Sequence, residues 1–167
     1  MCAPNTPCLR WRKTVTSRET FPNARGTSKS VRILVVDDYE PWRRFVCSTL
    51  LQSPELQVVG EGSDGLEAVQ KAKELQPDLI LLDIGLPMLN GIEAANRIRH
   101  VATSAKILFT SQNDDQDVVQ AALSTGGQGY LLKENSTDEL LSAIEAVMQG
   151  NRFVTKQLNR QLRVSFP

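Results

Sequence analysis

Long apolar runs, histidines and paired cysteines are all scarce in this chain of 167 residues. The longest apolar runs, Ile33–Val36 and Leu79–Leu82, have four residues each, far fewer than the roughly 20 that a membrane helix needs. The first 30 residues are basic, but they contain no apolar stretch of the kind found in secretory signals. These absences, with an odd number of three cysteines, favour a cytoplasmic protein without a membrane partner.

The single histidine restricts the catalytic chemistry further. The chain has no C-x-x-C pair, so no zinc site is predicted. A Ser-His-Asp or Cys-His nucleophile needs a histidine base, and only His100 could serve. His100 stands beside Arg99 in a helical pattern, where a solvated surface side chain is the simpler interpretation.

Charge is balanced over the whole chain but not along it. Nineteen basic and nineteen acidic residues give a formal net charge of zero. Residues 1–30 carry +5, residues 31–150 carry −9 and residues 151–167 carry +4. We predict a basic, disordered extension over 1–30, a folded domain over 31–150 and a basic tail or linker remnant over 151–167. The basic residues of the two ends are too few to predict direct nucleic-acid binding.

Strand-like and helix-like stretches alternate between residues 31 and 150. Uninterrupted apolar runs predict strands that are buried on both faces, and the stretches between them have helical periodicity. The predicted strands are Val31–Val36, Gln57–Gly60, Asp78–Leu82, Lys106–Phe109 and Gly129–Leu132. Five such β/α units predict an α/β fold, a doubly wound five-stranded parallel sheet with helices on both faces.

Two helix starts have a capping signature. Asn90 is predicted to cap a helix from Gly91 to about His100, with Glu93 as its capping-box partner. Ser136 is predicted to cap the last helix in the same way, with Glu139 three residues on.

Polar side chains follow the predicted strands, and the carboxyl ends of parallel strands share one edge of the sheet. Asp37, Asp38, Asp83, Thr110 and Lys133 stand at these ends. Three crowded carboxylates repel one another unless a cation neutralises them, and hard oxygen ligands suit Mg²⁺. Asp83, after the central apolar run, is the candidate nucleophile, because a carboxylate oxygen can attack a phosphoryl group. Lys133 would supply a second positive charge and Thr110 a hydroxyl donor.

Four motifs at these strand ends resemble one known family. They are VVDD (Val35–Asp38), LLDIGLPMLNGIEA (Leu81–Ala94), ILFTS (Ile107–Ser111) and GYLLKE (Gly129–Glu134). In this order they are similar to the receiver domain of two-component response regulators, most of all to the NarL/FixJ (LuxR-type) subgroup. The resemblance implies a flavodoxin-like fold with strand order 2-1-3-4-5.

The resemblance also assigns roles to individual residues. It implies a phospho-acceptor at Asp83, an Mg²⁺ ion held by Asp37, Asp38, Asp83 and the main chain of Gly85, phosphoryl contacts from Thr110 and Lys133, and a conformational switch of Thr110 and Tyr130. A static core aromatic is the alternative for Tyr130. Glu134 stands where many receivers have proline, and Gly126-Gly127 is a looser pair than expected before the last strand.

Partners follow from the same resemblance. A histidine kinase or a phosphotransfer protein would donate the phosphoryl group, and the last helix–strand–helix face would dock a partner or a second copy. The chain would then be no enzyme beyond its own phosphorylation and slow dephosphorylation. Two alternatives stay open: a binding module that works without phosphorylation, and a fragment of a DNA-binding transcriptional regulator. Only 17 residues follow Gly150, too few for a helix-turn-helix domain of roughly 50–60 residues.

Overall fold

The computed structural model describes residues 30–159, so almost all of the predicted extension over residues 1–30 lies outside the described part. Its sheet has six parallel strands in the order β2-β1-β3-β4-β5-β6. The elements are β1 (Val31–Val36), α2 (Glu40–Leu50), β2 (Leu56–Gly62), α3 (Gly65–Leu75), β3 (Leu79–Asp83), α4 (Gly91–Val101), β4 (Lys106–Ser111), α5 (Gln116–Ser124), β5 (Gly129–Leu132), a 3-10 turn η2 (Lys133–Asn135), α6 (Ser136–Met148) and β6 (Phe153–Val154). None of the helices between residues 30 and 159 has the length and apolar content to cross a membrane.

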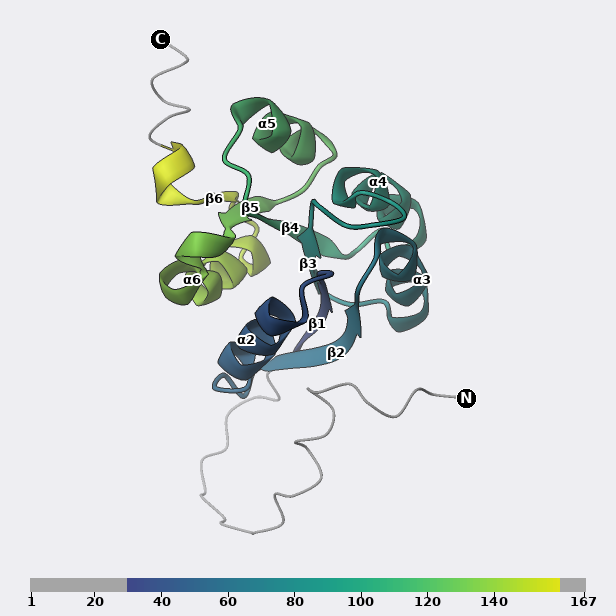
Figure 1. The fold of residues 1–167 in the computed structure, drawn as a ribbon. Coiled ribbons are helices and arrows are strands. Elements are labelled where there is room, and N and C mark those ends of the chain that lie inside the picture. The colour runs from purple at the N-terminus through teal and green to yellow at the C-terminus, as the bar shows by residue number, and fades with distance from the viewer. Residues whose placement is uncertain (1–29, 160–167) are drawn as a thin grey trace, which may run out of the picture.

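Helices cover both faces of the sheet, as the alternation of elements predicts (Figure 1). Helices α2 and α6 pack on one face, and α3, α4 and α5 pack on the other. Successive side chains of β1 alternate between the two cores: Ile33 and Val35 join the first, Leu34 and Val36 the second. The doubly wound parallel sheet and the order of its first five strands are therefore confirmed.

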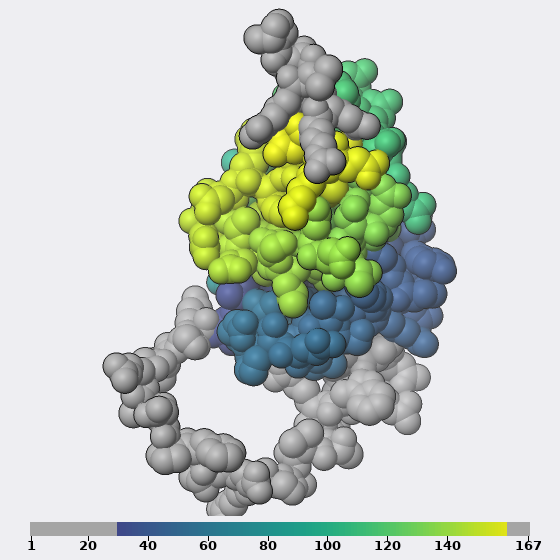
Figure 2. Space-filling view, turned by 90° about the vertical axis from the view of Figure 1, so that its left-hand side faces the viewer, coloured from purple at the N-terminus to yellow at the C-terminus, as the bar shows by residue number. Residues whose placement is uncertain are grey.

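A sixth strand was not predicted. Phe153 and Val154 pair in parallel with Gly129 and Tyr130 of β5, and Leu158 beyond them is fully buried in the core. In Figure 2 this segment, in yellow, lies against α6, in yellow-green. Two residues are too few to show a strand period, and the surrounding basic residues masked the apolar ones. The division of the chain at residue 150 remains a prediction.

The helix starts follow the predicted caps in part. Asn90 Oδ1 accepts a hydrogen bond from the Glu93 amide at 2.9 Å, as expected. The Glu93 carboxylate, however, pairs with Arg97 at 3.1 Å. Ser136 does not cap α6: the helix begins at Ser136, with Asn135 before it and no side-chain cap. The turn η2 leads the chain directly into α6, so Ser136 already lies inside the first helical turn.

Gly91 allows α4 to start close to the end of β3. A Cβ atom at this position would lie 2.0 Å from the main-chain oxygen of Asp83 and 2.8 Å from Ile84 Cα. Any larger residue would push the helix away from the strand that carries Asp83. The glycine therefore fixes the distance between α4 and the polar edge of the sheet.

Candidate functional site

The polar strand ends meet at one edge of the sheet. Asp37 directly follows β1, Asp83 ends β3 and Lys133 directly follows β5. Lys133 Nζ lies 2.6 Å from Asp37 Oδ2 and 2.7 Å from Asp83 Oδ1. The structure thus brings together three of the predicted site residues in one ion-paired group, with Asp37 fully buried and Asp83 4% exposed.

Burial and charge shift the ionisation of this group. Burial raises the pKa of Asp83, and the nearby carboxylates of Asp37 and Asp38 raise it further, whereas Lys133 opposes the change. Burial alone would lower the pKa of Lys133, but its hydrogen bonds to the Asp37 and Asp83 carboxylates outweigh that effect and raise it. The ammonium group therefore keeps its proton, while burial, together with the neighbouring carboxylates, disfavours the ionised form of Asp83.

Trp42 is a further neighbour of Lys133. The ammonium nitrogen lies 5.1 Å from the centre of the Trp42 ring, and the tryptophan is 9% exposed in the first turns of α2. At this distance a lysine is attracted to the ring face, an interaction worth about 0.5–2 kcal/mol. Its place in the apolar stripe of the helix concealed this contact, since the sequence alone favours ordinary core packing.

A cavity of about 430 Å³ opens beside the ion-paired group. Its lining includes four predicted site residues, Asp38, Asp83, Gly85 and Lys133. The other lining residues are Tyr39, Ser111, Gln112 and Asn113. The cavity therefore carries two carboxylates and one ammonium group on a rim of polar loops.

Thr110 lies beside this cavity but does not line it. It stands opposite Asp83 in the register of β3 and β4, and its side chain is fully buried. Its Oγ1 atom has no hydrogen-bond partner among the described residues. A buried hydroxyl without a partner is unfavourable, so this group is available to a new acceptor at the cavity.

Tyr130 is also fully buried. Its hydroxyl donates a 2.7 Å hydrogen bond to the main-chain oxygen of Asn113, in the loop between β4 and α5. Burial raises the pKa of Tyr130, and the charges of nearby aspartates, including Asp83, add to the effect. Because Asn113 also lines the cavity, the tyrosine is tethered to the same loop that borders the site.

The oxygen donors of the cavity fit a hard cation. Within residues 30–159, no three His, Cys, Asp or Glu side chains are already gathered as a metal-binding cluster. Lys133 occupies the space between the carboxylates of Asp37 and Asp83, with which it pairs. Carboxylates of Asp38 and Asp83 nevertheless line one cavity with Gly85, and the charges of Asp37 and Asp38 raise the pKa of Asp83. A cation would relieve that repulsion, and this donor set suits Mg²⁺.

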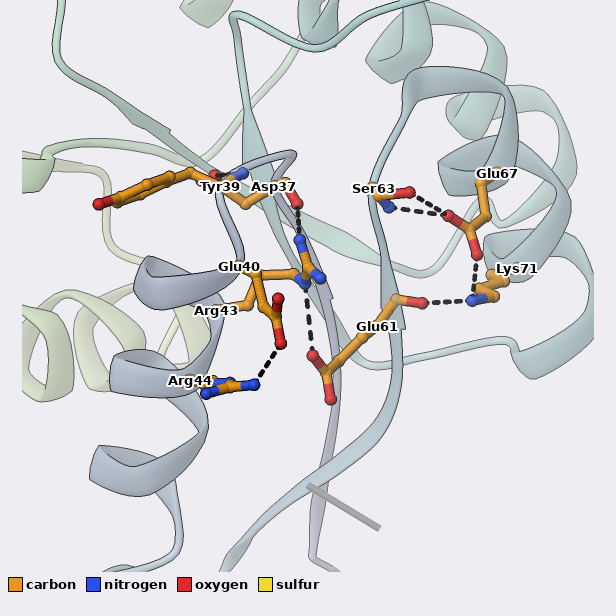
Figure 3. Close-up of polar contacts among 9 residues, drawn as sticks. All are labelled: Asp37, Tyr39, Glu40, Arg43, Arg44, Glu61, Ser63, Glu67 and Lys71. Atoms are coloured by element: carbon orange, nitrogen blue, oxygen red, sulfur yellow. Dashed lines mark hydrogen bonds and ion pairs between the residues drawn. The ribbon is translucent and has the colours of Figure 1, made fainter. Parts of the chain in front are cut away.

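Arg43 and Glu61 support the acidic edge from behind, and the sequence did not indicate either (Figure 3). Arg43 Nη1 donates a 2.6 Å hydrogen bond to the main-chain oxygen of Asp37. Its Nε atom pairs with Glu61 Oε2 at 3.4 Å. The Tyr39 amide donates to Asp37 Oδ1 at 2.9 Å. An arginine and a glutamate 18 residues apart have no local pattern that could have revealed them.

Comparison with known proteins identifies the class to which this fold and site belong. The model of the response regulator receiver domain matches residues 33–145. The chain therefore belongs to the family of receiver domains of two-component response regulators, and the resemblance carried by its four motifs is confirmed.

Relatives and solved structures agree with this assignment. The chain is 35% identical over 140 residues to the transcriptional regulatory protein DegU of Brevibacillus brevis, covering 84% of this chain and 59% of the relative. It is 37% identical over 134 residues to the nitrate/nitrite response regulator NarL of Escherichia coli K12, covering 80% and 62%. The chain thus spans about three fifths of the length of these relatives.

Two solved structures match the fold along almost their whole length. A LuxR-family two-component response regulator from Aurantimonas sp. superposes with a TM-score of 0.78 at 30% identity, covering 81% of this chain and 97% of that one. The receiver domain of NarL from Mycobacterium tuberculosis superposes with a TM-score of 0.70 at 32% identity, covering 74% and 99%.

Proposed function

We propose that this chain accepts a phosphoryl group on Asp83. The observation that carries the proposal is the position of Asp83, whose carboxylate lines the cavity and lies 2.7 Å from the ammonium group of Lys133. A carboxylate oxygen of Asp83 would attack phosphorus in a phosphohistidine of the donor. The P–N bond breaks, the imidazole leaves with the bonding pair and takes up a proton, and an acyl phosphate remains on Asp83.

The neighbouring residues divide the remaining tasks. Asp37, Asp38, Asp83 and the main chain of Gly85 would hold Mg²⁺, which when bound neutralises charge on the phosphoryl oxygens. Lys133 would pair with one phosphoryl oxygen, so that its present contacts with Asp37 and Asp83 are exchanged in part for the new anion. Positioning and charge neutralisation are the main requirements of phosphoryl transfer.

Thr110 and Tyr130 would couple phosphorylation of Asp83 to a conformational change at the surface. The unpartnered hydroxyl of Thr110 would donate to a phosphoryl oxygen, which draws the end of β4 towards Asp83. The Tyr130 hydroxyl bonds to the main-chain oxygen of Asn113, in the loop that follows β4. A movement of this loop would alter the face formed by α5, β5 and α6, where a partner or a second copy would dock.

The donor in this proposal is a histidine kinase or a phosphotransfer protein, in the cytoplasm. The chain would act as a signalling protein that catalyses only its own phosphorylation and slow dephosphorylation. A second candidate function comes from the relatives, since DegU is a transcriptional regulatory protein and this chain spans 59% of its length. The chain would then be the receiver of a longer DNA-binding regulator, and reading the genomic frame past Pro167 tests this.

Mass spectrometry after incubation with Mg²⁺ and acetyl phosphate tests the proposal. We expect the mass of one phosphoryl group to be gained by the unmodified protein and by Asp114→Asn, which changes an exposed loop carboxylate. Asp83→Asn should gain none. No gain by the unmodified protein, or a gain that survives Asp83→Asn, contradicts the proposal. Equal partner binding with and without beryllium fluoride would instead favour a module that works without phosphorylation.

A further inference from the structure

We propose that Arg43 is a positioning residue for the acidic edge of the sheet, which is formed by Asp37, Asp38 and Asp83. Arg43 holds the main chain of Asp37 and thereby keeps the carboxylates of Asp37 and Asp38 in place. This inference rests on the proposed function, because it concerns the same Mg²⁺ and phosphoryl site. Arg43 itself lies outside the lining of the cavity. It would act through Asp37 and not by touching the reacting atoms.

Each oxygen of Asp37 has its own partner. The Tyr39 amide binds Oδ1 at 2.9 Å, Lys133 pairs with Oδ2 at 2.6 Å, and Arg43 Nη1 donates to the main-chain oxygen at 2.6 Å. The pairing of β1 with β2 ends here, where the Asp37 amide donates to Gly62 at 3.0 Å. Beyond this point the chain turns towards α2. Arg43 therefore binds the main-chain oxygen of the first residue after β1, where pairing with β2 ends.

Glu61 anchors Arg43 to the sheet. It lies on β2 opposite Val35 of β1, and it is 7% exposed. Its Oε2 atom pairs with Arg43, while its Oε1 atom is buried and has no hydrogen-bond partner in the described part of the chain. The main-chain oxygen of Glu61 accepts a hydrogen bond from Lys71 of α3 (Figure 3). A buried carboxylate of this kind depends on its cation, so the pair fixes the guanidinium group relative to β2.

The geometry requires an arginine. Its planar guanidinium group presents several donors in fixed directions, so one side chain can bind Glu61 through Nε and Asp37 through Nη1. A lysine has a single nitrogen on a flexible stem and would carry the charge without this rigid arrangement. The contacts therefore distinguish a positioning role from a purely electrostatic one.

Arg44 provides a matched control on the same helix. It pairs with Glu40 one turn earlier, and both side chains are at least half exposed. Replacing that pair removes one positive and one negative charge, as does replacing both Arg43 and Glu61. The two double variants Arg43→Met/Glu61→Met and Glu40→Met/Arg44→Met thus leave the net charge unchanged. They also avoid an unpaired Glu61, which would destabilise Arg43→Met alone.

The first experiment uses the metal-free protein. Amide exchange of Tyr39, measured by NMR, reports the bond from its N–H to Asp37 Oδ1. We expect roughly tenfold faster exchange in Arg43→Met/Glu61→Met, since a hydrogen bond from a charged donor is worth about this factor. Exchange should be unchanged within roughly twofold in Glu40→Met/Arg44→Met, as expected for an exposed pair. Equal exchange in all three proteins would overturn the proposal.

The second experiment measures Mg²⁺ binding by NMR titration and phosphorylation by acetyl phosphate. We expect Mg²⁺ binding to be roughly tenfold weaker in Arg43→Met/Glu61→Met. We expect Arg43→Lys to weaken Mg²⁺ binding as well. Wild-type binding in Arg43→Lys would show that charge alone matters and would overturn the positioning role. Absence of phosphorylation in the unmodified protein contradicts the proposed function instead, and the exchange of the Tyr39 amide still decides whether Arg43 holds Asp37.

Discussion

The two sides of the cavity are held in different ways. At the ends of β1 and β3, charged groups pair with one another: Lys133, which follows β5, reaches across to bridge Asp37 and Asp83, and Arg43 holds the Asp37 main chain. Apart from Lys133, the site residues of β4 and β5 have uncharged contacts. Among residues 30–159, Thr110 Oγ1 has no hydrogen-bond partner, and the Tyr130 hydroxyl bonds to the loop carbonyl of Asn113.

The difference indicates where the molecule can change. Ion pairs in a buried environment are strong and costly to break one partner at a time. A neutral hydrogen bond contributes about 1 kcal/mol and can be exchanged for another. We therefore expect the β1 and β3 side to keep its geometry and the β4 and β5 side to rearrange when an anion reaches the cavity.

Of the variants considered, Lys133→Met should lower the free energy of unfolding most, because it removes the ion pairs at the ends of β1 and β3. Asp37 and Asp83 would be left buried without a cation, which costs about 3–5 kcal/mol, whereas Lys73→Met changes an exposed side chain of α3 and should cost little. The pKa of Lys133 is raised, so its contribution is complete below the ordinary lysine pKa and is lost as the pH rises through the raised value. Urea unfolding at neutral and alkaline pH measures both. Similar losses for the two variants would refute the comparison.

Asp83→Asn should change stability in the opposite direction, by less than Lys133→Met. The pKa of Asp83 is raised above its ordinary value of 3.8, so the folded protein retains this proton to higher pH than the unfolded chain. Stability of the unmodified protein therefore falls as the pH rises from about 3.8 through the raised pKa. Asp83→Asn lacks that fall and should be the more stable protein at neutral pH. Unfolding curves at a series of pH values that run parallel for the two proteins would contradict this.

Tyr130→Phe should affect only the side of the cavity formed by β4 and β5. It removes the bond to the Asn113 oxygen and should cost about 1 kcal/mol while leaving phosphorylation of Asp83 intact. Hydrogen exchange should rise in the loop from residue 112 to 115. Tyr39→Phe is the control, because Tyr39 is 59% exposed. Loss of Asp83 phosphorylation in Tyr130→Phe would show that the two sides of the cavity do not act independently.

Arg97→Met should cause the smallest loss of stability among these variants. Arg97 and Glu93 form an ion pair one turn apart on α4, and both side chains are about half exposed. Its loss should cost roughly 0.3–0.5 kcal/mol at low ionic strength and close to nothing in high salt. A loss as large as that of Lys133→Met, measured by urea unfolding, would mean that burial does not separate the two kinds of ion pair.

Much of the fold and part of the site could be predicted because both follow from strand ends. Apolar runs locate parallel strands, and the residue after each run must lie at the shared edge, which brought Asp37, Asp83 and Lys133 together correctly. The roles assigned to these residues remain predictions. Thr110 was expected at the cavity, and it lies beside Asp83 with its hydroxyl buried.

The unpredicted features depend on contacts between distant residues. Arg43 and Glu61 meet only because α2 packs against β1 and β2 in the folded chain. Trp42 satisfies the apolar stripe of its helix equally well with or without Lys133 over its ring. Ser136 has a capping signature, but the turn η2 places it inside the helix. Periodicity describes each element by itself and contains no information on such encounters.

The short strand β6 also bears on how the molecule avoids association with other chains. A long, regular edge strand offers unpaired main-chain groups to any extended segment and so invites aggregation. Here β6 covers β5 and leaves an edge of only two residues. At the opposite edge, the pairing of β2 with β1 is interrupted by a register shift between Ile33 and Leu34. Within residues 30–159, we therefore expect both edges of the sheet to be poor templates for the addition of a strand from another chain.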